Sequence, residues 1–172
     1  VLSPSLVSET SKDFGSQCMV VAIDAKATAS PGEQRVDSDE AIPPDDLALD
    51  EQSGWEVYTH GGRKATGIDA VKWAKRAADL GAGELLITSM DADGQTTGYD
   101  LELIRMVSSG VSIPVIASGG MGTLDHLIDV VKKGQADAVA MADVLHYKRM
   151  NLADIRQAAL EAAIHVRHFG PI

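Results

Sequence analysis

The sequence predicts an α/β protein in which parallel β-strands alternate with helices. Four short runs, 18–23, 84–88, 113–117 and 136–141, are apolar throughout and lack the alternation of a strand with one exposed face. Amphipathic stretches separate them, and the later strands begin 29 and 23 residues apart, which fits successive βα units. Four such units are consistent with a small open sheet or with half of an eight-stranded barrel.

A short helix is expected ahead of the first strand, and a long polar insert follows that strand. The insert, at about 28–54, contains the run DSDEAIPPDDLALDE (37–51), which holds seven of the 25 acidic residues and no basic one. Such low hydrophobicity and high charge oppose packing, so we expect the middle of the insert to be mobile. The runs EQRV (33–36) and WEVYTH (55–60) could pair across it as a hairpin.

Four amphipathic helices are expected between and after the remaining strands. The first occupies 67–81, and the second lies within 99–110. The third begins at Thr123, a favourable N-cap, and ends in two lysines that suit the negative end of the helix dipole. The last helix lies within 151–166, with Asn151 as its expected cap.

The composition predicts one globular domain, 1–172, with a single sizeable core, since 45% of the residues are hydrophobic and 23% are charged. The net charge of −10 lies largely in the acidic run, which argues against nucleic acid or an anionic membrane as a partner. The single cysteine, Cys18, excludes an intramolecular disulfide and an all-cysteine zinc site. Without a membrane-length apolar run or a secretory start, a cytoplasmic protein is expected.

The carboxyl ends of the strands carry the candidate functional residues, because parallel α/β folds collect their working groups there. Asp24 directly follows the run VVAI. An acid in that position must be paired, hydrogen-bonded or shifted in pKa. A structural pair with Lys26 is one interpretation, and a catalytic acid is the one we favour.

The segment TSMDADG (88–94) follows the second predicted strand and admits several interpretations. It can be a plain solvent turn, or one of Asp91 and Asp93 can cap the helix that begins near Tyr99. A catalytic rim is the alternative, in which Gly94 lets the backbone approach an anion held by main-chain N–H groups. No histidine lies nearby to complete a metal site, and we expect neither a metal nor a cofactor.

The segment SGGMGT (118–123) combines a strand end, a glycine turn and a helix start, which is the general arrangement for phosphate at a helix N-terminus. It lacks the Gly-Lys-Ser/Thr of a P-loop, and a mere tight turn is the alternative interpretation. The histidines are scattered, and packing or capping is the expected role of each: His60, His126, His146, His165 and His168.

Several motifs taken together carry a resemblance to a known family. They are VVAIDAK, WEVYTHGGRKATGIDAVKWAKRAADLGAGELLITSMDADG, GYDLELIR, PVIASGGMG and LHY. In this order they resemble the cyclase subunit of imidazole glycerol phosphate synthase, from about Pro4 to Phe169. The resemblance covers the carboxyl-terminal half of that family, and so implies strands five to eight of a (βα)8 barrel.

The resemblance implies a role for each residue at the predicted rim. Asp24 matches the catalytic acid of strand five, which would protonate the substrate during ammonia addition and ring closure. The other matching residues hold substrate or phosphate: Thr88, Ser89, Asp93, Gly94, Ser118, Gly119, Gly120, Ala142 and Asp143. Where this chain has Ala92, Gln95 and Asp143, the family usually has Arg, Thr and Ser. The last difference puts a carboxylate beside an expected phosphate, which is repulsive.

The implied function is that of a lyase of histidine biosynthesis. With ammonia from a glutaminase subunit, it would convert a phosphorylated ribulosyl aminoimidazole carboxamide to imidazole glycerol phosphate and aminoimidazole carboxamide ribotide. Because the resemblance covers half a barrel, we expect little or no turnover from this chain alone. Two alternatives remain. One is a self-associating phosphate-binding half-barrel, closed as a homodimer; the other is the sibling ribotide isomerase, although GGRKATG and GYD favour the cyclase.

Overall fold

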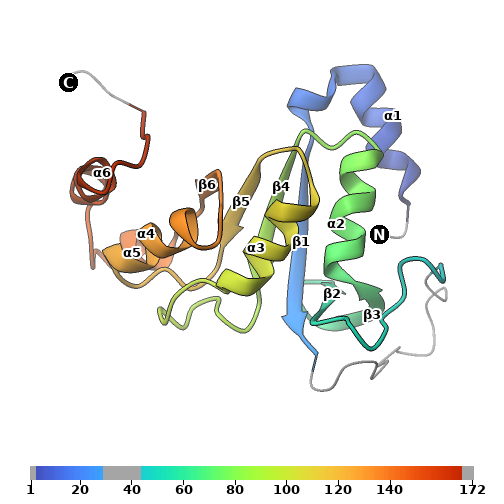
Figure 1. The fold of residues 1–172 in the computed structure, drawn as a ribbon, viewed down its shortest axis with the longest axis horizontal. Coiled ribbons are helices and arrows are strands. Elements are labelled where there is room, and N and C mark those ends of the chain that lie inside the picture. Colours follow the sequence, from blue (N-terminus) through green and yellow to red (C-terminus); the bar gives the residue numbers. More distant parts are fainter. Residues whose placement is uncertain (1–2, 29–43, 168–172) are drawn as a thin grey trace.

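The computed structural model describes residues 3–28 and 44–167 and confirms the α/β class (Figure 1). After helix α1 (Ser5–Phe14) and a short 3-10 turn, four strands lie parallel in one sheet. They overlap the four predicted runs: β1 (Val20–Ala27), β4 (Glu84–Ser89), β5 (Val115–Ser118) and β6 (Ala138–Val139). The last is much shorter than the predicted 136–141. β1 continues beyond the predicted 18–23, so Asp24 lies within the strand and not after it.

Two further strands extend the sheet beyond β1; the first matches the predicted run WEVYTH, and the second was not predicted. The strands β2 (Trp55–Thr59) and β3 (Lys64–Asp69) form an antiparallel hairpin, giving the order β3-β2-β1-β4-β5-β6. Both edges of β2 are therefore occupied, so the predicted pairing of WEVYTH with EQRV is wrong; EQRV itself lies outside the described residues. The helix predicted over 67–81 starts later, because β3 continues to Asp69.

The second part of the predicted insert is packed against the hairpin. Leu47 and Leu49 are each only 6% exposed, and Leu49 N donates to Gly67 O at 3.0 Å. Lys72 Nζ donates to a carboxylate oxygen of Asp50 at 2.7 Å, and this contact is the largest cause of the lowered pKa of Asp50. The end of the insert, 44–54, is therefore packed. The predicted mobility concerned the middle of the insert, and residues 29–43 lie outside the described residues.

Helices cover one face of the sheet, which we call the covered face. Figure 1 shows α2 (Ala70–Asp79) and α3 (Leu101–Gly110) side by side over the strands, with α4 (Leu124–Lys132) beyond α3. Alternate strand residues point toward these helices and are almost fully buried: Ile23, Ala25, Leu85, Ile87, Val115 and Ala117. Apolar helix residues meet them, including Trp73, Ala77, Leu103, Ile104, Val107 and Val130. This layer is the core.

The opposite face, which we call the open face, carries the other set of alternate residues. Val20 is 49% exposed, Ala22 and Ala138 are exposed, and Leu86 and Ile116 are only half-buried. Apolar side chains thus line a face that the described elements leave accessible. The apolar runs predicted strands buried on both faces, and the structure provides burial on one.

The carboxyl-terminal helices flank the last strand. The short α5 (Asp143–His146) follows β6, and α6 (Leu152–Glu161) contacts α4, with Ile155 and Ala159 buried. Asn151 caps α6 as predicted, since its side chain accepts from Asp154 N. None of the helices in the described ranges is long and apolar enough to cross a bilayer.

Candidate functional site

A row of polar side chains crosses the open face at the carboxyl ends of the strands. Asp24 is the register partner of Thr88, which in turn is the partner of Ser118. Their strand neighbours Ile23, Ile87 and Ala117 are buried beneath the helices, so these three point the other way. With parallel strands about 4.8 Å apart, Asp24 and Ser118 lie roughly 10 Å from each other.

Asp24 is half-buried within this row and does not form the ion pair with Lys26 that was one interpretation of the sequence. Lys26 instead places its ammonium 5.7 Å from the centre of the Tyr58 ring. Tyr58 is the register partner of Asp24 on the other side, from β2. The carboxylate is thus flanked by a phenol, a hydroxyl and a nearby cation, and it is accessible to a ligand on the open face.

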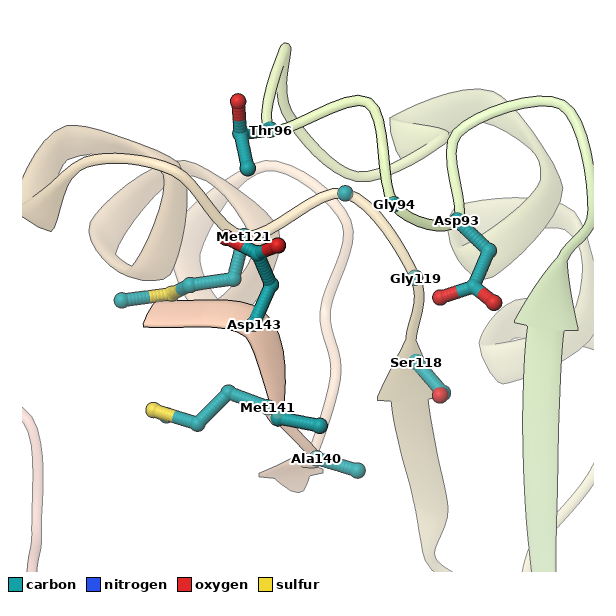
Figure 2. Close-up of a pocket in the computed structure, with 11 residues that line it drawn as sticks. Asp93, Gly94, Thr96, Ser118, Gly119, Met121, Ala140, Met141 and Asp143 are labelled. Atoms are coloured by element: carbon teal, nitrogen blue, oxygen red, sulfur yellow. The ribbon is translucent and has the colours of Figure 1, made fainter. Parts of the chain in front are cut away.

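A pocket of about 340 Å³ lies at the same end of the sheet (Figure 2). Three segments form it: the loop after β4, the turn after β5 and the segment that joins β6 to α5. Seven predicted binding residues line it together: Asp93, Gly94, Ser118, Gly119, Gly120, Ala142 and Asp143. Because Ser118 belongs both to the pocket and to the polar row, the two features adjoin.

The glycine turn after β5 packs closely on the loop after β4. A Cβ at Gly120 would lie 2.0 Å from the carbonyl oxygen of Gly98, and one at Gly119 would lie 2.7 Å from that of Ser89. Both glycines have positive φ, +87° and +108° for Gly119 and Gly120. Only glycine fits at these two positions, so the geometry of a tight turn is enough to explain why both residues are glycine. Within the described ranges their amides donate to no protein acceptor, which leaves them available to an anion.

Gly94 differs from these two. Its φ of +71° favours glycine, yet the space that a Cβ would occupy has no atom within 4 Å. A small side chain there would face solvent or the pocket rather than clash with the fold. Gly94 is therefore constrained by its backbone conformation alone.

The aspartates of the loop after β4 divide into structural and accessible groups. Asp91 accepts a hydrogen bond from Ala27 N at 2.8 Å and so ties the loop to the end of β1. Asp93 is exposed and lines the pocket, with its carboxylate directed toward Gly119 in Figure 2. Neither caps α3; that interpretation is wrong, because Asp100 is the cap and accepts from Leu103 N at 3.0 Å.

Asp143, the first residue of α5, lies on the far side of the pocket. Its side chain is 23% exposed and makes an ion pair with Arg149, whose Nε lies 3.0 Å from Oδ1. The same Oδ1 is shielded from solvent and has no hydrogen-bond partner, so the contact is close in distance but not aligned as a hydrogen bond. The negative charge of the Asp143 carboxylate, which would repel a phosphate, is thus partly offset by the positive charge of Arg149.

Two of the predicted binding residues lie outside the pocket lining. Thr88 is on the open face, in the middle of the polar row. Ser89 is 3% exposed and is the register partner of buried Ala25, so its side chain belongs to the covered face. Ser89 contributes to the site through its carbonyl oxygen, which accepts from Asp93 N at 2.9 Å.

Sequence reasoning missed two aromatic residues that brace the site. Tyr99 is 7% exposed, donates from its hydroxyl to Ala140 O at 3.2 Å, and has its pKa raised to about 12 by burial. Trp55 Nε1 donates to Asp100 Oδ2 at 2.8 Å, which connects the hairpin to the start of α3. Tyr99 lies in the GYD motif, so the sequence did mark this position, but nothing in the motif indicated the hydrogen bond to Ala140.

His126 caps the helix that follows the glycine turn, as expected for the histidines. Its Nδ1 accepts from Gly122 N at 3.2 Å and from Thr123 N at 3.3 Å, completing a capping box with Thr123. These two amides, which directly precede α4, are therefore engaged by the protein, whereas no acceptor within the described ranges takes the amides of Gly119 and Gly120. Within the described ranges, no three His, Cys, Asp or Glu side chains are grouped to hold a metal.

A comparison with protein families agrees with this architecture. The model of the family described as "Histidine biosynthesis protein" matches residues 1–151, which includes the polar row, the pocket and the loops that form them. Its members are enzymes of histidine biosynthesis with a barrel-type α/β fold. The chain belongs to the histidine biosynthesis protein family.

Proposed function

We propose that this chain is the carboxyl-terminal half of an imidazole glycerol phosphate synthase cyclase. The complete enzyme would use ammonia to convert the phosphorylated ribulosyl aminoimidazole carboxamide to imidazole glycerol phosphate and aminoimidazole carboxamide ribotide. The observation that carries the proposal is that Asp24 and the glycine-lined pocket open at the same end of the sheet, joined by Thr88 and Ser118.

In this proposal the pocket holds one phosphate of the substrate. The amides of Gly119 and Gly120 supply donors, and Gly94 allows the backbone to approach. A substrate chain running from this phosphate across Ser118 and Thr88 would bring its reacting atoms to Asp24, roughly 10 Å away. Asp24 would then donate a proton as general acid during ammonia addition and ring closure.

The proposal requires a second half to finish the barrel. β1 pairs with β2 only from Asp24 to Ala27, so among the described residues the segment 20–23 has a strand partner on one side alone. β6 likewise ends the described sheet. Two edges and an accessible apolar face favour closure by further βα units, whether on a longer form of this chain or on a separate one. That half would supply the opposing carboxylate, and a glutaminase partner would supply ammonia.

Complementation tests the proposal directly. The 172-residue chain is mixed with an amino-terminal cyclase half, and ammonia-dependent turnover is measured for each part and for the mixture. Activity should require both parts, and Asp24→Asn should abolish it, whereas Asp79→Asn, which removes an exposed acid at the end of α2, should not. Turnover by this chain alone at the rate of an intact cyclase would refute the need for a second half.

The two alternative functions give different results in the same preparations. Light scattering that shows a monodisperse homodimer, together with an inactive mixture, would favour the self-associating phosphate-binding half-barrel. Turnover of the isomerase substrate in place of the cyclase substrate would favour the sibling enzyme. The cyclase proposal predicts turnover of the cyclase substrate only.

A further inference from the structure

The pocket that would hold phosphate contains acidic side chains and no basic one. Of its lining residues only Asp93 and Asp143 are charged, and both are acids. A phosphate dianion placed among them would meet like charges on two sides. Asp93 is exposed, so water and salt screen it; Asp143 is three-quarters covered and is the stronger obstacle.

The structure provides one cation in contact with Asp143. Arg149 lies just beyond the pocket, on the loop after α5, with Nε 3.0 Å from Asp143 Oδ1. The loop returns to the helix, because the Arg149 amide donates to Val144 O at 2.9 Å. The guanidinium also lies 5.4 Å from the centre of the Tyr147 ring. These contacts hold the side chain beside Asp143.

We propose that Arg149 is a positioning residue for phosphate, which makes the pocket accept an anion by offsetting the charge of Asp143. The inference rests on the proposed phosphate site and adds a residue that does not itself line the pocket but contacts the lining residue Asp143. With the pair intact, the carboxylate contributes little net repulsion, and the amides of Gly119 and Gly120 remain free to donate. Without Arg149, the covered carboxylate faces the anion uncompensated.

Titration of four proteins with inorganic phosphate tests the proposal. Binding is followed by the NMR shifts of the Gly94, Gly119 and Gly120 amides, with ionic strength held constant by chloride. Arg149→Gln should weaken binding about threefold to fivefold, the range of a partly exposed charge contact. Lys148→Gln, which removes the same charge from the neighbouring exposed residue, should leave the affinity unchanged.

The double variant Asp143→Asn with Arg149→Gln separates the proposed role from other roles of Arg149. Removing the carboxylate removes the repulsion that Arg149 offsets, so the double variant should bind phosphate about as well as the native protein. If the double variant stayed as weak as Arg149→Gln, Arg149 would contact phosphate or support the loop directly, and the proposal would be overturned.

Two other outcomes also count against the proposal. Unchanged affinity in Arg149→Gln would overturn the role of Arg149 while leaving the phosphate site intact. If no amide of the pocket shifted in any of the four proteins, the phosphate site itself and the role of Arg149 would both be rejected. The first result separates this inference from the proposed function, and the second removes both.

Discussion

Alternate residues of the same strands form the two faces of this sheet, yet the two faces differ in how far their side chains are buried. On β4, Ile87 is 1% exposed beneath the helices, while its neighbour Leu86 points to the open face and is only half-buried. The covered face is a finished core, whereas the open face combines apolar surface with the polar row of Asp24, Thr88 and Ser118. The packed core and the proposed site therefore lie on opposite sides of one sheet.

A similar division holds at the carboxyl ends of the strands. Asp91, Tyr99 and Asp100 are engaged in hydrogen bonds that hold the loops to the strands and to α3. Asp93, Gly119 and Gly120 line the pocket, and within the described ranges the amides of the two glycines have no protein acceptor. One set of residues thus fixes the loops through hydrogen bonds. The Asp93 carboxylate and the two glycine amides make no hydrogen bond within the described protein and are available to a ligand.

The largest expected effect on stability is the difference between substitutions on the two faces of one strand, β4. Ile87→Ala should lower the free energy of unfolding by about 3–4 kcal/mol, because it leaves a cavity in a packed core. Leu86→Ala should cost about 1 kcal/mol or less, because the leucine is already partly in water. Urea unfolding followed by circular dichroism measures both. Equal losses would mean that something covers the open face in the isolated chain.

The glycines of the site should differ in the same way. Gly120→Ala should destabilise the protein by about 3 kcal/mol, since the added Cβ meets the Gly98 carbonyl and the positive φ is unfavourable. Gly94→Ala meets no neighbour and should cost only about 1–2 kcal/mol, from its backbone conformation. A bulkier residue at Gly94 should weaken phosphate binding while the chain remains folded; unchanged phosphate affinity would favour a plain turn.

Alkaline pH should expose the role of Tyr99 beneath the pocket. Burial raises its pKa from 10.0 to about 12, so the unfolded chain loses this proton first as pH rises. Stability should therefore fall between about pH 10 and pH 12, by up to about 2–3 kcal/mol. The measurement is the difference between native protein and Tyr99→Phe, which lacks the ionising hydroxyl. Parallel stability curves for the two proteins in this range would contradict the burial effect.

The smallest expected effect on folding is at the proposed catalytic acid. Asp24 is half-buried on the open face, and Asp24→Asn should change the free energy of unfolding by no more than about 0.5 kcal/mol. The same variant should abolish turnover in the complemented enzyme. A large loss of stability would instead assign Asp24 to the structure.

The α/β class and the four parallel strands could be predicted because a strand that is buried in the fold appears in the sequence as a run of apolar residues. The hairpin could not be predicted in the same way. Its turn depends on positive φ at His60, Gly61 and Gly62, and its strands mix polar and apolar residues and form no continuous apolar run. The predicted pairing with EQRV failed because both edges of β2 are already used.

For the site, the sequence could predict residues near the ends of strands. It could not predict which face of the sheet each side chain points to. Asp24, Thr88 and Ser118 share a face because they share a register row, whereas Ser89 is one residue further and points to the core. Sequence alone gives no register, so it could not separate Thr88 from Ser89. Contacts such as Asp143 with Arg149 depend on the short α5 and its following loop, which no sequence pattern specified.

In the proposed site, Asp24 and the pocket bind one ligand from one face of the sheet. The most direct measurement is an amide NMR titration of this chain with a sugar phosphate. The amide signals of Gly94, Gly119 and Gly120 should shift together with those of Asp24 and Thr88, at one common affinity. The signals of buried residues such as Leu103 in α3 should stay unchanged. Shifts confined to the helices of the covered face, or the absence of any shift at the glycine turn, would contradict it.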